Sequence, residues 1–269
     1  MFISSLLLPK QGSTRLECED ALEQWPSSDS GDEVTGDFLV AAISDGASES
    51  ALAKDWSKML VRDVVARASA DRDLLGGPTA GFAGLVAELV DNWERHLYDY
   101  VKRRNESDKP VQWYEEPKFE RGAFATLLAV QVERSADTGV CSWQAAALGD
   151  SCLFQVRDGR LLISFPLSDP RDFGTTPNLF GSRNRDSELI VSRTHFTSGT
   201  VEQGDCLLMM TDALAAWFLS LGDGLPEELV RLTDFSRQND LAGFETWVTS
   251  LRVSGQLHND DVALVHIDV

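Results

Sequence analysis

The chain has few of the features that stabilise secreted proteins or form zinc sites. Its 269 residues contain only four cysteines, and these lie far apart, without a CxxC pair or a histidine at zinc-ligand spacing. No apolar run approaches the roughly 18 residues needed to span a bilayer. The N-terminal MFISSLLLPK has neither a basic segment before its apolar stretch nor a small-residue cleavage site after it. We therefore expect a reduced, cytoplasmic protein that does not bind membranes.

Positive charge is also scarce. The chain has 24 Lys and Arg against 43 Asp and Glu, which gives a formal net charge of −19. Binding to nucleic acids or anionic membranes requires a dense basic surface, so we expect neither as a partner. The hydrophobic content of 43% and the charged content of 25% are typical of a globular protein. The length fits a single domain over 1–269.

Aspartates at the ends of apolar runs are what the chain does have. They occur in FLVAAISDG (Asp45), AAALGDS (Asp150), CLLMMTDAL (Asp212) and, in reverse order, HNDDVALVHI (Asp260 and Asp261). Singly, such an aspartate is most often a turn former or a helix N-cap. If several converge, their repulsion opposes folding unless a cation compensates it. Hard carboxylate oxygens favour Mg²⁺, Mn²⁺ or Ca²⁺ over zinc.

The periodicity predicts a mixture of helices and closely spaced strands. Apolar residues that recur every three or four positions predict a helix over 48–70 and a second helix from Thr79, its expected N-cap. Asp158-Gly159 between two apolar runs predicts a hairpin, and the short spacing of the strands favours antiparallel sheets. We also expect strands at 1–8, 37–44, 188–196, 205–211 and 262–268, helices near 213–221, 226–233 and 240–252, and loops at 27–36 and 103–120.

One long segment, 168–187 (SDPRDFGTTPNLFGSRNRDS), has no period and is rich in Pro, Gly, Ser, Asn and charge. Such a long loop in a compact domain is usually a mobile functional element or disordered.

The motifs RLECEDA, SDG, GAFATLL, ALGDSCLFQVRDGRL, LLMMTDAL and NDDVALVHI occur in this order between Arg15 and Val269. The chain thereby resembles the metal-dependent serine/threonine protein phosphatases of the 2C type (PPM family), in particular bacterial members. The resemblance implies an α+β fold, a four-layer αββα sandwich of two mainly antiparallel β-sheets flanked by helices. It also implies that 168–187 forms a substrate-facing flap.

The resemblance further implies a site with two or three Mn²⁺ or Mg²⁺ ions, in which a water activated by two of the ions attacks the phosphate directly. Asp45 would bridge two ions and act in catalysis, and the Gly46 carbonyl would contact one of them. Arg15 would grip the substrate phosphate and assist catalysis. The other implied ligands are Asp20, Asp212 and Asp260, with Asp150 for a weaker third ion, and with Glu19 and Asp261 acting through water or as supports.

Three positions depart from the family pattern. Ala47 replaces a histidine proposed as the general acid of eukaryotic members, Ala213 replaces a glycine, and Cys152 replaces a common arginine. None of these changes removes an implied ligand. The expected function is hydrolysis of phosphoserine and phosphothreonine in proteins, opposing a serine/threonine kinase. Two alternatives stay open: a catalytically weak phosphoprotein-binding or regulatory module, and another dimetal phosphoester hydrolase.

Overall fold

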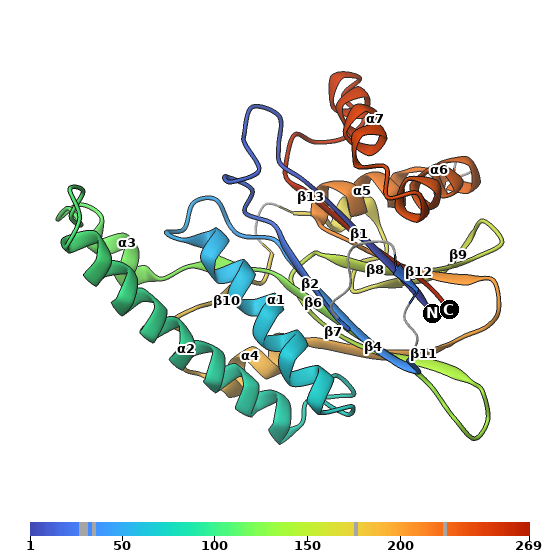
Figure 1. The fold of residues 1–269 in the computed structure, drawn as a ribbon, viewed down its shortest axis with the longest axis horizontal. Coiled ribbons are helices and arrows are strands. Elements are labelled where there is room, and N and C mark those ends of the chain that lie inside the picture. Colours follow the sequence, from blue (N-terminus) through green and yellow to red (C-terminus); the bar gives the residue numbers. More distant parts are fainter. Residues whose placement is uncertain (27–31, 34–35, 175–176, 223–224) are drawn as a thin grey trace.

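Two antiparallel sheets pack face to face and helices cover both outer surfaces (Figure 1). The computed structural model describes residues 1–26, 32–33, 36–174, 177–222 and 225–269. Sheet I consists, in spatial order, of β3 (Asp32–Glu33), β1 (Phe2–Leu8), β13 (Val262–Asp268), β12 (Asp205–Met210), β8 (Cys152–Arg157) and β9 (Arg160–Phe165). Sheet II consists of β11 (His195–Val201), β7 (Cys141–Leu148), β6 (Leu127–Arg134), β4 (Phe38–Ser44) and β2 (Ala21–Trp25).

The helices form the two outer layers. Figure 1 shows α1 and α2 on the side of sheet II and α5, α6 and α7 on the side of sheet I. Their bounds are α1 (Ala53–Ala70), α2 (Ala80–Asn105), α5 (Asp212–Ser220), α6 (Leu225–Arg237) and α7 (Leu241–Val253). The shorter elements are α3 (Glu116–Arg121), α4 (Ser187–Arg193), the 3₁₀ turn η1 (Pro170–Asp172), and the paired short strands β5 (Phe124–Ala125) and β10 (Phe180–Gly181).

Three apolar clusters hold these layers together. The middle cluster lies between the sheets and joins residues such as Ile43 and Leu128 of sheet II to Met209 and Val265 of sheet I. The other two bind the helices to the outer faces of the sheets. β4 is buried along its whole length because both of its faces are covered, which explains its uninterrupted apolar run. The predicted four-layer αββα sandwich is confirmed.

Several local predictions are also confirmed. Thr79 caps α2, since its side chain accepts a hydrogen bond from the backbone N–H of Phe82 at 3.2 Å. Arg157 pairs with Arg160 across the predicted hairpin between β8 and β9. Within the described residues, no helix is both long enough and apolar enough to cross a bilayer.

Other local predictions were wrong. The expected strand at 188–196 is mostly α4, because the Asp186 side chain accepts from the N–H of Leu189 at 2.9 Å and starts a helix; the strand begins only at His195. The expected loop at 103–120 contains the end of α2 and most of α3. β2 was not predicted. Within the expected loop at 27–36, residues 32–33 form β3, while 27–31 and 34–35 lie outside the described residues.

Candidate active site

The predicted aspartates lie where the two sheets end side by side. In sheet II, Ala21 pairs with Ser44, so Asp20 and Asp45 extend from neighbouring strands at the same end. In sheet I, Leu8 pairs with Val262 and Met210 pairs with Cys152. The same end of sheet I is therefore bordered by Asp150 before β8, by Asp212 after β12, and by Asp260 and Asp261 before β13. The topology thus gathers residues that are up to 241 positions apart, from Asp20 to Asp261.

The turn that carries Asp45 is fixed by backbone hydrogen bonds. The Asp45 N–H donates to the Thr126 hydroxyl at 2.9 Å, and the Thr126 N–H donates to the Asp45 carbonyl at 2.8 Å. Thr126 Oγ1 also lies 2.9 Å from the hydroxyl of Ser151, the neighbour of Asp150. This chain of contacts links the loops that carry Asp45 and Asp150.

Glycine is required at two positions of this site. A Cβ on Gly46 would lie 2.9 Å from the Glu19 carbonyl oxygen and 3.1 Å from the backbone of Ala53, so the Asp45-Gly46 turn and the Glu19-Asp20 segment meet closely. Gly149 has a φ of +115°, and a Cβ there would lie 2.6 Å from the Thr126 side chain. Both glycines allow backbone segments that carry carboxylates to approach their neighbours.

The carboxylates repel one another strongly. Burial first, and then repulsion from Asp212, Asp260 and Asp150, raises the pKa of Asp45 well above its usual range. Burial and the charges of Asp45 and Asp261 raise the pKa of Asp20 in the same way. Burial raises the pKa of Asp212 to about 6, with further contributions from Asp150 and Asp260. Such mutual destabilisation of the charged forms is what a bound cation would relieve.

Two buried oxygens strengthen the case for a cation. Asp20 Oδ2 and Asp150 Oδ1 are buried and have no hydrogen-bond partner. A buried acceptor without a partner costs about 1–3 kcal/mol, more if it is charged, so these atoms fit a site for a hard divalent ion. In the part of the chain that the structure describes, no group of three or more His, Cys, Asp or Glu has the arrangement of a complete metal site. An ion shared by these aspartates would therefore need side-chain orientations other than those in the structure.

Asp260 and Asp261 have different surroundings. The two carboxylate oxygens of Asp261 accept the backbone N–H groups of Lys10 at 2.6 Å and of Glu19 at 2.7 Å. Asp260 Oδ1 accepts the N–H of Asp261 at 2.9 Å, and its charge acts on both Asp45 and Asp212. Both carboxylate oxygens of Asp261 are thus engaged with backbone groups, although its charge still acts on Asp20, whereas Asp260 acts on Asp45 and Asp212.

Arg15 is exposed, and it borders an apolar cavity of about 270 Å³ together with Leu7, Pro9 and Leu241. Among the described residues, no hydrogen bond or ion pair fixes its guanidinium. Another cation, Lys10, is paired with a carboxylate of this region. Lys10 Nζ lies 3.4 Å from Glu19 Oε2. Burial lowers the pKa of Lys10, but the charges of Glu19, Asp261 and Asp260 raise it above its usual value. The sequence assigned no role to Lys10, which no motif contains, or to Thr126, which the motif GAFATLL does contain.

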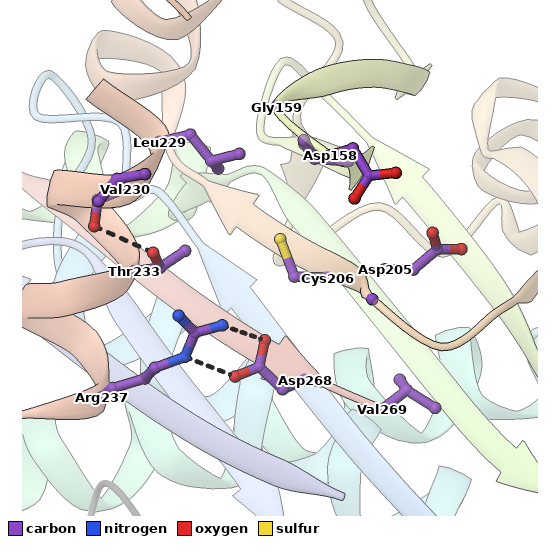
Figure 2. Close-up of a pocket in the computed structure, with 12 residues that line it drawn as sticks. Asp158, Gly159, Asp205, Cys206, Leu229, Val230, Thr233, Arg237, Asp268 and Val269 are labelled. Atoms are coloured by element: carbon purple, nitrogen blue, oxygen red, sulfur yellow. Dashed lines mark hydrogen bonds and ion pairs between the residues drawn. The ribbon is translucent and has the colours of Figure 1, made fainter. Parts of the chain in front are cut away.

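A cavity of about 370 Å³ lies at the other end of sheet I, beside the start of β12 (Figure 2). Two of its acidic side chains, Asp268 and Asp205, accept hydrogen bonds from arginines. Figure 2 shows Arg237 in contact with Asp268 through two hydrogen bonds, of 2.8 and 3.0 Å. Asp205 accepts from Arg157, which does not line the cavity. Because Asp205 begins β12 and Asp212 follows its end, this cavity is separate from the gathered aspartates.

Comparison with solved structures identifies the fold. A bacterial serine phosphatase matches 98% of this chain and 96% of its own, with a TM-score of 0.59 and 12% identity. The Mycobacterium tuberculosis serine/threonine phosphatase PstP/Ppp matches 100% of this chain and 99% of its own, with a TM-score of 0.54 and 16% identity. The catalytic domain of PstP in complex with two manganese ions matches 99% and 98%, with a TM-score of 0.52 and 15% identity.

No family model matches the chain, and no curated protein matches it in sequence. The structural matches extend over nearly the full length of both partners. The chain therefore has the fold of bacterial serine/threonine phosphatases, and the resemblance to the 2C type is confirmed at the level of the fold.

Proposed function

We propose that this protein is a metal-dependent serine/threonine protein phosphatase that hydrolyses phosphoserine and phosphothreonine in proteins. The observation that carries the proposal is the gathering of Asp20, Asp45, Asp150 and Asp212, with raised pKa values and two unpartnered buried oxygens, at one end of the paired sheets. The fold, which serine/threonine phosphatases share, supports it.

In this proposal the residues divide into ligands and supports. Asp45 and the Gly46 carbonyl, with Asp20, Asp212 and Asp260, hold two Mn²⁺ or Mg²⁺ ions, and Asp150 serves a third. When bound, the ions supply activation of a water nucleophile and neutralise charge on the phosphoryl group. Glu19 and Asp261 keep the surrounding loops in place.

The substrate is held by the chain's own groups. Arg15 offers a planar pair of donors for phosphoryl oxygens, a geometry that lysine does not provide. The segment 168–187 is proposed as the flap that faces the substrate. The whole of 1–269 is proposed as one catalytic domain, acting in the cytoplasm against a serine/threonine kinase.

Ala47 bears on how the leaving group is protonated. Alanine cannot donate a proton to the departing serine or threonine oxygen, so the proton must come from water. Turnover of esters with poor leaving groups is therefore expected to suffer more than turnover of p-nitrophenyl phosphate, whose leaving group needs little protonation.

The test is an assay of the purified protein with Mn²⁺ and with Mg²⁺ on a phosphothreonine peptide and on p-nitrophenyl phosphate. Metal-dependent hydrolysis of both, abolished by a chelator, is expected. No metal-dependent turnover on either substrate would sink the enzyme proposal.

A second candidate is a phosphoprotein-binding module with little or no catalysis. Ala47, Cys152 and Ala213, at three positions where the family pattern has other residues, favour it. It predicts binding of phosphopeptides without turnover. Assays on nucleotides and oligonucleotides test the remaining alternative, another dimetal phosphoester hydrolase, for which the net charge of −19 makes nucleic acid a poor substrate.

A further inference from the structure

Lys10, Glu19 and Ser48 form a small polar cluster on the rim of the proposed active site. Lys10 Nζ lies 3.4 Å from Glu19 Oε2 and 3.1 Å from the Ser48 hydroxyl. The same Glu19 oxygen accepts a short hydrogen bond from Ser48. One carboxylate oxygen thus holds both a lysine and a serine, which come from two different loops.

This cluster borders the gathered aspartates. Glu19 directly precedes Asp20, and the Glu19 carbonyl lies so close to Gly46 that a Cβ there would approach it to 2.9 Å. Ser48 follows Gly46 by two positions. Burial lowers the pKa of Lys10, but Glu19, Asp261 and Asp260 together raise it above its usual value. The ammonium is therefore a lasting positive charge beside a strongly negative site.

The ammonium still has capacity for a ligand. A lysine carries three N–H donors, and two of them are accounted for by Glu19 and Ser48. Its side chain is 29% exposed, so solvent and ligands reach it. Ser48 is exposed as well, and its oxygen can exchange partners when an anion binds. Arg15, in contrast, stands beside an apolar cavity and is not fixed by any polar contact among the described residues.

We propose that Lys10 and Ser48 form a phosphate-binding point of this site, which receives oxygens of the substrate phosphoryl group and of the released phosphate. Glu19 is a positioning residue in this arrangement, because it holds the lysine and the serine together. A fixed cation at the rim attracts a phosphate dianion that the surrounding aspartates would otherwise repel. The inference rests on the proposed phosphatase function for its substrate.

The test compares Lys10→Ala, Lys10→Arg, Ser48→Ala and Arg15→Ala with the wild type and with Lys102→Ala, which removes an exposed lysine from α2. Two measurements are made with Mg²⁺ present: steady-state kinetics on a phosphothreonine peptide, and binding of inorganic phosphate by calorimetry. Loss of a charge-assisted hydrogen bond is expected to weaken phosphate binding and raise KM by roughly ten- to a hundredfold in Lys10→Ala, with a much smaller change in kcat.

Lys10→Arg should recover part of the loss, Ser48→Ala should lose less than Lys10→Ala, and Lys102→Ala should match the wild type. If Lys10→Ala binds phosphate as the wild type does, the inference is wrong, whatever the enzyme's activity. If the wild type shows no turnover but binds phosphate through Lys10, the phosphatase proposal fails and the binding point stands. Thermal unfolding of each variant verifies that it is folded.

Discussion

At the scale of single residues, Asp45 is the position where stability and proposed activity conflict most. Burial and the neighbouring carboxylates Asp212, Asp260 and Asp150 penalise its charged form in the metal-free protein. We expect Asp45→Asn to abolish metal-dependent turnover and also to raise the melting temperature of the metal-free protein at neutral pH. Each kcal/mol of repulsion that the substitution relieves should raise the melting temperature by about 2–4 °C. Calorimetric scans with and without Mn²⁺, together with the phosphatase assay, provide the measurement.

The same scans separate a metal ligand from an ordinary surface acid. Mn²⁺ should stabilise the wild type by an amount that grows with metal concentration, and should stabilise Asp45→Asn much less. Asp137→Asn, at an exposed position, is the matched control and should behave as the wild type in every scan. Equal stabilisation of Asp45→Asn and the wild type by Mn²⁺ would show that Asp45 is not a ligand.

A second prediction at the scale of single residues concerns Gly149. Gly149→Ala must place a side chain at a φ of +115°, with its Cβ 2.6 Å from Thr126. The backbone strain costs about 1–2 kcal/mol and the overpacking a further 1–3 kcal/mol. Chemical unfolding should show the sum, and Mn²⁺ affinity should fall because Thr126 supports Asp45.

Gly204→Ala is the control for the backbone term alone, because Gly204 has a φ of +94° but no atom lies within 4 Å of the place that a Cβ would take. It should cost only about 1–2 kcal/mol and leave Mn²⁺ affinity unchanged. If the two alanine variants lose the same stability, the contact with Thr126 does not constrain the loop.

At the scale of elements, the start of β12 is held by a partly buried ion pair, in which Asp205 is buried and Arg157 is partly exposed. Asp205 accepts hydrogen bonds from Arg157 at 2.9 Å, from Gln155 at 2.7 Å and from the Glu202 N–H at 2.9 Å. The bonds from Arg157 lower the pKa of Asp205 most, although burial opposes them. A carboxylate with a lowered folded-state pKa stabilises the fold above its ordinary pKa of 3.8, and this contribution is lost as the pH falls through the folded value.

Asp205→Asn should therefore be less stable than the wild type by roughly 1.5–3 kcal/mol at neutral pH. The difference should stay constant down to about pH 4 and shrink at lower pH. Urea unfolding at a series of pH values measures it. Asp158→Asn, at an exposed turn bordering the same cavity, should show no such difference. A gap between Asp205→Asn and the wild type that widens on acidification would contradict this account.

The elements that the sequence predicted are those with strong local signals. The run FLVAAIS specifies β4, and Thr79 with the apolar positions after it specifies α2. β2 was not predicted because ALEQW is short and carries charge, and it becomes a strand through its pairing with β4. α4 was predicted as a strand because ELIV has the composition of one, but the Asp186 side chain caps the segment and starts a helix. Context outweighs propensity in both cases.

The site divides in the same way. The gathering of most aspartates could be predicted because they border apolar runs, and the family resemblance ordered them and added Asp20, which stands in RLECEDA and borders no such run. The contact of Lys10 with Glu19 and Ser48 could not, because it depends on how two loops meet above Gly46. The position of Arg15 beside an apolar cavity could not be predicted either, since side-chain direction in an irregular loop has no sequence signal.

At the scale of the whole molecule, the net charge of −19 is expected to bias which phosphoproteins approach the site of the proposed phosphatase. A negative surface attracts cationic segments and slows anionic ones, and added salt screens both effects. We expect phosphopeptides with flanking Arg and Lys to have a higher kcat/KM than matched peptides with flanking Asp and Glu. Kinetics at low and high NaCl concentration provide the measurement, and the difference should shrink in high salt. A preference that ignores salt would point to specific contacts instead.

Asp261 anchors the loop between β1 and β2 at two points. Its one carboxylate secures the backbone at both Lys10 and Glu19, so the residues between them leave and return at fixed points. Gln11 is also tied to Asn259, and the Leu16 carbonyl accepts from Lys54. Changes of length or sequence within 12–15 then need not disturb the pairing of β1 with β13 or of β2 with β4. In the proposed phosphatase, this segment, which includes Arg15, is therefore a place where contacts with the substrate can change while the aspartates keep their places.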